Sequence, residues 1–297
     1  MSIQASIITL CYNQLETATK PFIESLYKYT NSDLFELIVI NNASDDGTYE
    51  YLENIKQQYN NIKIIHNSEN GGYAKGNNQG MKIAEGQYLF MLNNDTLFMP
   101  NWLERMIEIL KTHQEIGILS TMTNHCIIPE QRIKNYQDLT PENYLQKVKL
   151  SSKNDITYND VIIFFCWAMR REVFEKVGFL DENFGRAWYE DADYTLRVLY
   201  NGYKPAFANN IFIFHNHSQT SGKFAQTKEA EELFKKNRAY FENKHKFYLD
   251  LKNRVAELEE QLAGKKKTNW YKKIFSISPD KSGKHKTLRI LGIKMKI

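Results

Sequence analysis

Residues 36–48, ELIVINNASDDGT, join a short apolar run to a cluster of amides, carboxylates and a glycine. A continuous apolar run is typical of a strand buried on both faces, and Asn, Asp and Gly favour the turn that follows. The same order recurs in ASIITLCYN (residues 5–13) and YLFMLNND (residues 88–95). Turn formation alone would explain any one polar cluster, but three clusters at the same edge of one predicted sheet favour a binding site.

Helical stretches separate these predicted strands. In residues 15–29, for example, Ala18, Phe22 and Leu26 recur at helical spacing. Strands that alternate with helices indicate an α/β fold with a mostly parallel sheet, whose ligands bind beyond the carboxyl ends of the strands. The predicted strands are residues 6–10, 36–40, 62–65, 88–92 and 116–119, and the predicted helices are residues 15–29, 48–59, 74–84 and 101–111.

Length, composition and cysteine content exclude several classes of protein. A chain of 297 residues with 42% apolar and 25% charged residues is expected to form one large or two small globular domains. Its longest apolar run, residues 161–169, is well short of the ~20 residues that span a bilayer, and residues 1–14 lack the basic start of a secretory signal. The cysteines, Cys11, Cys126 and Cys166, have unrelated spacings that suggest neither a disulfide framework nor a zinc site, so we expect a cytoplasmic protein.

The middle of the chain is less regular. Residues 123–160 are polar and weakly periodic, and they are predicted to form a variable connection. The apolar residues 161–169 return to the core, and a short helix is expected at residues 171–177. The stretch WYEDAD (residues 188–193) then opens a helix that ends near residue 201. Because carboxylates in a first helical turn are favoured by the helix dipole, capping alone would suffice to explain them.

The composition changes after residue 222, and three parts are predicted: an α/β domain at residues 1–222, a charged helical extension at 223–263 and a basic tail at 264–297. Apolar residues of the extension step alternately by three and four positions, which is heptad spacing. These residues are Tyr248, Leu251, Val255, Leu258 and Leu262. A helix with about three heptads is long enough to pack on residues 1–222 or to form a coiled coil with a second copy in a homo-oligomer.

The tail is strongly basic. Residues 265–297 contain eleven lysines or arginines and one aspartate, a net charge of +10, which leaves −6 on residues 1–264. Cations mixed with aromatic side chains at residues 265–275 fit an anionic membrane surface, so peripheral membrane contact is one expectation. Alternation of apolar residues and lysines from residue 293 to 297 predicts instead a short strand packed on the preceding part of the chain. No motif supports nucleic-acid binding.

In order and spacing, several segments resemble glycosyltransferase family 2. These segments are SIITLCYN, ELIVINNASDDGT, NGGYAKGNNQG, YLFMLNND and GFLDENFGRAWYEDADYTLRVLYNGYK. The resemblance covers residues 3–220. It implies a GT-A fold, which is a Rossmann-like sheet flanked by helices, and sugar transfer with inversion from a UDP, dTDP or GDP sugar. Within the family, NGGYAKGNNQG and LNND are similar to rhamnosyltransferase-type sequences.

The resemblance assigns residues to the donor site. It implies that Leu10 and Tyr12 line the nucleobase and ribose, that Asn42 meets the base edge, and that Lys75 offsets phosphate charge. The family commonly has Asp within the pair occupied here by Asn41 and Asn42, and an amide can still donate and accept hydrogen bonds there. The other residues expected to bind substrate are Asp45, Asn78, Asn93, Asn94 and Trp188.

A divalent cation, Mg²⁺ or Mn²⁺, is the expected cofactor. Residues 93–95, NND, occupy the position of the DxD element of the family, so Asp95 supplies the carboxylate for the metal. Mg²⁺ often binds through one or two carboxylates together with substrate phosphates. His215 matches a histidine that some members use as a metal ligand, and it is preferred to His217.

Glu190 and Asp191 match the acidic pair of the family. The pKa of an acceptor hydroxyl is far above neutrality, so a carboxylate must take its proton as the glycosidic bond forms. By position Asp191 is the expected base. Glu190 is expected to orient the site or to contact the acceptor, and Asp193 to hold a neighbouring loop or to cap the helix.

The expected acceptor is a hydroxyl on a cell-surface polysaccharide, a lipid-linked glycan or a protein. A sugar-1-phosphate nucleotidyltransferase has a similar core, but CYNQLET lacks the GGxGTRL-type loop of that class. A non-catalytic glycan-binding or assembly protein derived from the same fold stays open as an alternative, although the presence of Glu190 and Asp191 argues against it.

Overall fold

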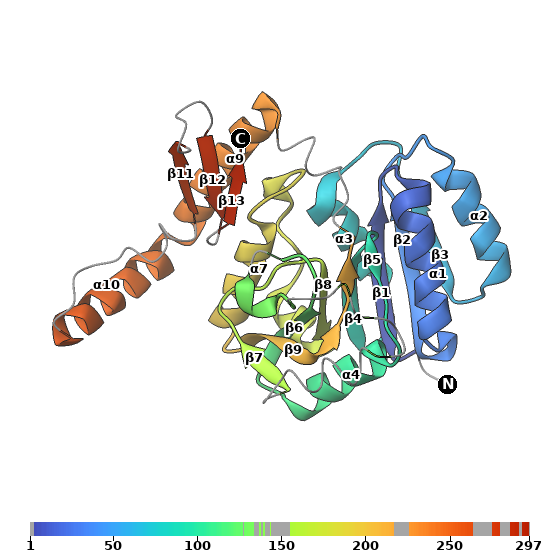
Figure 1. Cartoon of the computed structure of the whole chain (residues 1–297), viewed down its shortest axis with the longest axis horizontal. Coiled ribbons are helices and arrows are strands. Elements are labelled where there is room, and N and C mark those ends of the chain that lie inside the picture. Colours follow the sequence, from blue (N-terminus) through green and yellow to red (C-terminus); the bar gives the residue numbers. More distant parts are fainter. Residues whose placement is uncertain are drawn as a thin grey trace. The chain divides into compact units, whose positions relative to one another are not determined.

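The computed structural model describes residues 3–126, 128–133, 155–216 and 226–263, isolated positions 137, 139 and 143, and the segments 275–279, 286–290 and 293–296. The chain divides into two compact units, residues 1–218 and 219–297 (Figure 1). The domain boundaries expected after residues 222 and 263 stay predictions.

A mixed sheet forms the centre of the first unit. Among the described residues, the strands follow the order β3-β2-β1-β4-β8-β6-β9-β7. The strands are β1 (Ala5–Cys11), β2 (Phe35–Asn41), β3 (Ile62–His66), β4 (Tyr88–Asn93), β6 (Ile116–Met122), β7 (Ile156–Tyr158), β8 (Cys166–Arg170) and β9 (Lys204–Phe212). Strands β1 to β4 pair in parallel, and β6 pairs in parallel with β9, whereas β7 and β8 run antiparallel to their neighbours. The predicted mostly parallel α/β architecture is confirmed.

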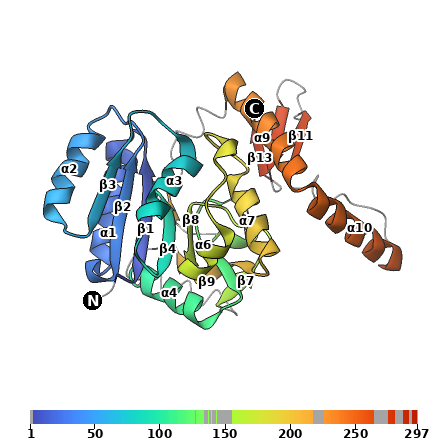
Figure 2. The ribbon, with the colours of Figure 1, turned by 180° about the vertical axis from the view of Figure 1, so that it is seen from behind.

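Helices cover both faces of this sheet (Figure 1, and from behind in Figure 2). One apolar cluster joins the sheet to α1 (Lys20–Tyr29), α2 (Thr48–Gln58) and α4 (Trp102–Thr112). A second joins the other face to α3 (Gly72–Ile83), α6 (Arg171–Val177) and α7 (Glu190–Tyr200). Residues of β1 alternate between the clusters, with Ile7 in the first and Ile8 in the second, as the period of two in a strand requires.

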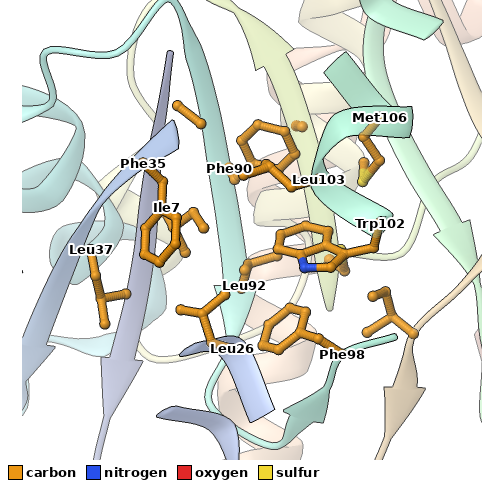
Figure 3. Packing of buried hydrophobic residues seen from close by; sticks show 14 of the residues in the cluster. Ile7, Leu26, Phe35, Leu37, Phe90, Leu92, Phe98, Trp102, Leu103 and Met106 are labelled. Carbon is orange, nitrogen blue, oxygen red and sulfur yellow. The ribbon is translucent and has the colours of Figure 1, made fainter. Parts of the chain in front are cut away.

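Trp102 lies at the centre of the first cluster (Figure 3). Its side chain is fully buried and meets Phe90 edge-on, with the ring centroids 5.7 Å apart, and Phe98 at 4.7 Å. Its indole Nε1 donates a hydrogen bond to Thr30 Oγ1 at 2.8 Å. The one polar atom of this large core side chain therefore has a hydrogen-bond partner.

Two predicted elements differ in detail from the observed ones. The helix expected at residues 15–29 begins as a π-helical turn, Leu15–Thr19, before α1 starts with Pro21 in its first turn. A short ribbon of β5 (Thr96–Leu97) and β10 (Phe214–His215) was not predicted. In the connection expected at residues 123–160, the described part includes 3-10 turn η3 (Pro129–Gln131) and β7.

The second unit contains α9 (Lys228–Lys244) and α10 (Lys246–Ala263), so the predicted single helix is divided at His245. Phe247, Leu251 and Val255 of α10 are exposed, and the coiled coil stays a prediction. Strands β11 (Phe275–Pro279), β12 (Lys286–Ile290) and β13 (Ile293–Lys296) form an antiparallel meander, which confirms a strand near residue 293. Among the described residues, none of the helices combines the length and apolar character that crossing a bilayer requires.

We predict that Thr30→Val lowers the free energy of unfolding by about 1–3 kcal/mol, because the buried indole N–H of Trp102 loses its acceptor. Urea denaturation measures the loss. Thr112→Val is the matched control, since its hydroxyl bonds Glu108 O at an exposed helix end. Equal losses in the two variants would contradict the role of Thr30.

Candidate active site

Helix α3 lies unusually close to strand β1. A Cβ atom at Gly76 would come within 2.4 Å of Leu10 Cδ2, a distance that side chains do not tolerate. Glycine in the NGGYAKGNNQG segment therefore brings the helix backbone against the end of the strand. Leu10, expected at the nucleobase, lies against Gly76 of this helix.

The start of α3 also touches the loop that leads to the acidic pair. Gly72 has φ +81°, and a Cβ there would be 2.7 Å from the carbonyl oxygen of Gly185 and 2.9 Å from Cα of Arg186. Deeper in the helix, buried Asn78 donates to the backbone oxygen of Leu180 at 2.9 Å and accepts from its nitrogen at 2.9 Å. Asn78 also donates to Glu182 Oε1 at 2.8 Å. Asn78, expected to bind substrate, thus fastens the loop to α3.

The acidic pair begins α7 directly after two residues with left-handed backbone. Trp188 has φ 71° and Tyr189 has φ 77°, a conformation that costs non-glycine residues free energy and often marks functional sites. Asp191 Oδ1 accepts a hydrogen bond from the backbone nitrogen of Ala192 at 2.7 Å. Asp193, one turn in, is fully buried and bound by Arg197 at 2.8 Å, which is a structural ion pair.

Desolvation makes both carboxyl groups of the pair more basic. Burial raises the pKa of Asp191 above its ordinary value of 3.8. Burial, and then the neighbouring charge of Asp191, raises the pKa of Glu190 above its ordinary value of 4.5. A carboxylate with a raised pKa binds a proton more tightly and is therefore better suited to act as a general base.

A second charged group lies at the end of β4. The expected metal residues Asp95 and His215 come together there, with Asp95 Oδ1 3.3 Å from His215 Nε2. The ribbon of β5 and β10 pairs Thr96 with His215, which places the histidine beside the aspartate. The Asn124 side chain makes two hydrogen bonds to the His215 backbone. Asn124 Oδ1 accepts from the backbone nitrogen of His215 at 2.7 Å, and Asn124 Nδ2 donates to the backbone oxygen of His215 at 3.0 Å.

Residues at the start of β8 contact both the surroundings of Asp95 and helix α3. Phe165, just before β8, stacks on the His215 ring at 5.2 Å, and the Phe165 oxygen accepts from Asn93 N at 2.8 Å. Trp167 donates from Nε1 to the hydroxyl of Tyr73 in α3 at 3.2 Å. The start of β8 therefore contacts the Asp95 side through Phe165 and the α3 side through Trp167. Both centres lie at the carboxyl-end edge of the parallel strands, where ligands of such sheets bind.

The amides expected at the nucleobase form a network of their own. Asn42 is buried, its Oδ1 accepts from Asn67 at 2.8 Å, and its Nδ2 donates to Gly72 O at 3.4 Å. Asn67 in turn donates to Gln79 at 2.8 Å. The structure thus shows Asn42 joining the ends of β2, β3 and α3, and its contact with a base stays a prediction.

The remaining expected substrate residues lie around the same edge. Tyr12 and Asp45 are exposed, and Lys75 is exposed and 3.5 Å from Glu69. Asn93 and Asn94 are half-buried, with Asn94 donating to Thr19 Oγ1 at 2.9 Å. The structure gathers these residues at one edge, but their roles toward a substrate stay predictions. His217 lies outside the described residues.

Sequence patterns did not identify Tyr73, Trp167 or Asn124. Tyr73 stands inside the glycine-rich segment and could have been noted as its single aromatic residue. Trp167 looks like an ordinary core residue, and Asn124 falls in the weakly periodic connection. Their positions depend on contacts across 94 and 91 residues of chain, which a local pattern does not reveal.

Comparisons with known proteins identify relatives. The model described as glycosyl transferase family 2 matches residues 6–178. An uncharacterized glycosyltransferase of Haemophilus influenzae is 26% identical over 266 residues, which are 86% of this chain and 79% of that protein. One of Methanocaldococcus jannaschii is 25% identical over 201 residues, which are 67% of this chain and 66% of that protein.

Solved structures share the fold. The mannosyltransferase PcManGT from Pyrobaculum calidifontis, in complex with GDP-Man and Mn²⁺, is similar with a TM-score of 0.57 and 17% identity. The similarity covers 76% of this chain and 60% of that one, so the chain spans less than two thirds of its length. The sheet and its flanking helices have the GT-A fold.

We predict that Gly72→Ala destabilises the protein more than Gly202→Ala does. Both glycines have positive φ, +81° and +79°, but a Cβ at Gly202 meets nothing within 4 Å. The left-handed conformation alone costs about 1–2 kcal/mol, and Gly72→Ala adds the collision with Gly185. Denaturant unfolding of both variants measures the difference, and equal losses would show that α3 does not press on this loop.

Proposed function

The chain belongs to glycosyl transferase family 2, and we propose that it transfers a hexosyl or deoxyhexosyl group from a nucleotide-diphosphate sugar to an acceptor hydroxyl, with inversion. The observation that carries the proposal is the approach of Asp95 and His215 at 3.3 Å, at the same sheet edge as the partly buried pair Glu190 and Asp191. Sugar transfer needs a site that accommodates the charge of the donor diphosphate and a general base. Asp95 and His215 would provide the first, and the acidic pair would provide the second.

The proposed roles follow from the surroundings of each group. Asp191 takes the proton of the acceptor hydroxyl, and its raised pKa strengthens it as a base. Glu190 orients the site beside it. Leu10, Tyr12 and Asn42 surround the nucleoside, and Lys75 approaches the phosphates. Trp188, whose backbone is left-handed, contacts the substrate.

Asp95 and His215 fit a divalent cation such as Mn²⁺ or Mg²⁺, because a carboxylate oxygen and an imidazole nitrogen already face each other. Among the described residues, no cluster of three or more acidic, His or Cys side chains forms a complete metal site. Donor phosphates would therefore supply further ligands. When bound, the cation would neutralise the negative charge of the leaving diphosphate. PcManGT, the relative with GDP-Man and Mn²⁺, supports this proposal.

Nucleotide release tests the proposed activity. The purified chain is incubated with UDP-, GDP- and dTDP-sugars, with Mg²⁺ or Mn²⁺, and with glycan acceptors. Release from one donor class and a product of inverted anomeric configuration, seen by NMR, are expected. If no donor is consumed while glycans still bind, the chain is a glycan-binding protein and the proposal is wrong.

We predict that Asp191→Asn keeps donor binding but lowers kcat by about 10²–10⁴-fold, because the amide keeps the shape of the carboxylate without accepting a proton. Calorimetric titration with the donor and a turnover assay measure the two effects. Asp33→Asn, at an exposed position before β2, is the control and is expected to behave as the wild type. Full turnover by Asp191→Asn would assign the base to another residue.

We predict that Asp95→Ala weakens donor binding in the presence of Mn²⁺ by about tenfold or more, since loss of this carboxylate would weaken binding of the cation that would offset the charge of the donor phosphates. Without metal, the wild type and the variant are expected to bind the donor equally. Unchanged affinity with metal present would place the cation elsewhere, and Asp33→Ala serves as the matched loss of a carboxylate.

A further inference from the structure

The ribbon that sets His215 beside Asp95 is very short. Strands β5 and β10 have two residues each, and a two-stranded ribbon of this length is not stable without support from its surroundings. On one side β10 is joined to the Asp95 segment: His215 lies opposite Thr96, and the backbone nitrogen of Asn216 donates to the backbone oxygen of Asp95 at 2.8 Å. The position of His215 therefore also depends on what holds the other side of β10.

Asn124 holds that other side in the way that a third strand would. Its Oδ1 accepts from the backbone nitrogen of His215 at 2.7 Å, and its Nδ2 donates to the backbone oxygen of His215 at 3.0 Å. A side-chain amide offers one acceptor and a donor, as a peptide group does, so one buried asparagine satisfies both backbone groups of the histidine.

The segment that carries Asn124 has hydrogen bonds of its own. Thr123 Oγ1 donates to Asn124 Oδ1 at 3.2 Å. The backbone nitrogen of Thr123 donates to the Gln131 oxygen at 3.0 Å, and the Thr123 oxygen accepts from Ile133 at 2.9 Å. Gln131 is fully buried and donates to Ser120 Oγ at 2.8 Å. The amide of Asn124 is therefore presented from a backbone that is already fixed.

The ring of His215 is held as well as its backbone. Phe165 stacks on it with the centroids 5.2 Å apart and an interplanar angle of 18°. Nδ1 lies 3.4 Å from the backbone oxygen of His125, and Nε2 lies 3.3 Å from Asp95 Oδ1. A ring nitrogen that binds a cation carries no proton, so a neutral ring then keeps its proton on Nδ1. The His125 oxygen can accept a hydrogen bond from that proton while Nε2 stays on the side of Asp95.

We propose that Asn124 is a positioning residue for His215: its amide fixes the His215 backbone, and the backbone oxygen of the next residue, His125, directs Nδ1, so that Nε2 faces a divalent cation held together with Asp95. The proposal rests on the cation site of the proposed function. Residues that orient a metal ligand in this way typically contribute about 10–100-fold to metal affinity.

A purely structural role for Asn124 leads to a different expectation. If the amide only stabilised the fold, its removal would lower the free energy of unfolding and leave the bond between His215 and the cation intact in the folded protein. If the amide positions the histidine, the folded variant loses that bond. The contact between nitrogen and metal is therefore the quantity to measure.

We predict that Asn124→Ala weakens the binding of Mn²⁺ alone by about tenfold or more and removes the bond between histidine and the bound ion. The EPR signal of free Mn²⁺ measures the affinity. Pulsed EPR on protein labelled with ¹⁵N-histidine detects nitrogen bound directly to Mn²⁺. The wild type is expected to show this nitrogen coupling, and His215→Ala is expected to lack it.

A second variant and a matched control separate positioning from folding. Asn124→Asp keeps the shape of the side chain, but an ionised carboxylate cannot donate to the His215 oxygen, so the nitrogen coupling is expected to be lost although a carboxylate is added. This variant carries the test if urea denaturation shows that Asn124→Ala is unfolded. In the control, Asn61→Ala, a half-buried amide that donates to the Phe35 oxygen at 3.0 Å and accepts from the Tyr27 hydroxyl at 3.0 Å is removed before β3, at the opposite edge of the sheet. It is expected to keep the affinity and the coupling of the wild type.

Two outcomes would overturn the positioning role: affinity and nitrogen coupling like those of the wild type in the folded Asn124 variants, or a wild type without histidine coupling. If nucleotide is released from a donor in either case, the proposed sugar transfer stands. If the coupling is lost in the Asn124 variants but no donor is consumed by the wild type, the positioning role stands and the proposed function is wrong.

Discussion

The site depends on the close approach of α3 to both the sheet and the loop that precedes α7. Gly76 lets the helix backbone rest on Leu10, and Gly72 lets its first turn meet Gly185 and Arg186 without an intervening side chain. Asn78 then fastens Leu180 with a hydrogen bond in each direction. The acidic pair is therefore held over the edge of the sheet by contacts with a helix more than a hundred residues earlier in the chain.

The two acidic centres differ in their surroundings. Asp95 lies 3.3 Å from the imidazole of His215, a side chain of the kind that commonly binds metals. Glu190 and Asp191 are adjacent in a desolvated setting, where burial raises both pKa values and the charge of Asp191 further raises that of Glu190. In the proposed function the first centre would hold a cation and the second would take a proton.

Much of the fold could be predicted, because continuous apolar runs fit strands that are buried on both faces. The strand expected at residues 36–40 lies inside β2, and the polar residues after it meet the other clusters at one edge. The place of β8 could not be predicted, since the run at 161–169 lacks a periodicity that shows direction or neighbours. The ribbon that sets His215 beside Asp95 has two residues in each strand, too few for any pattern.

A diffraction experiment at the manganese absorption edge tests the central claim most directly, on crystals grown with Mn²⁺ and a non-hydrolysable nucleotide-diphosphate sugar. An anomalous peak between Asp95 and His215, with the sugar bound between that ion and Asp191, is the expected result. A metal peak away from Asp95, or a donor whose sugar faces away from Asp191, would contradict the assignment of both acidic centres to one active site.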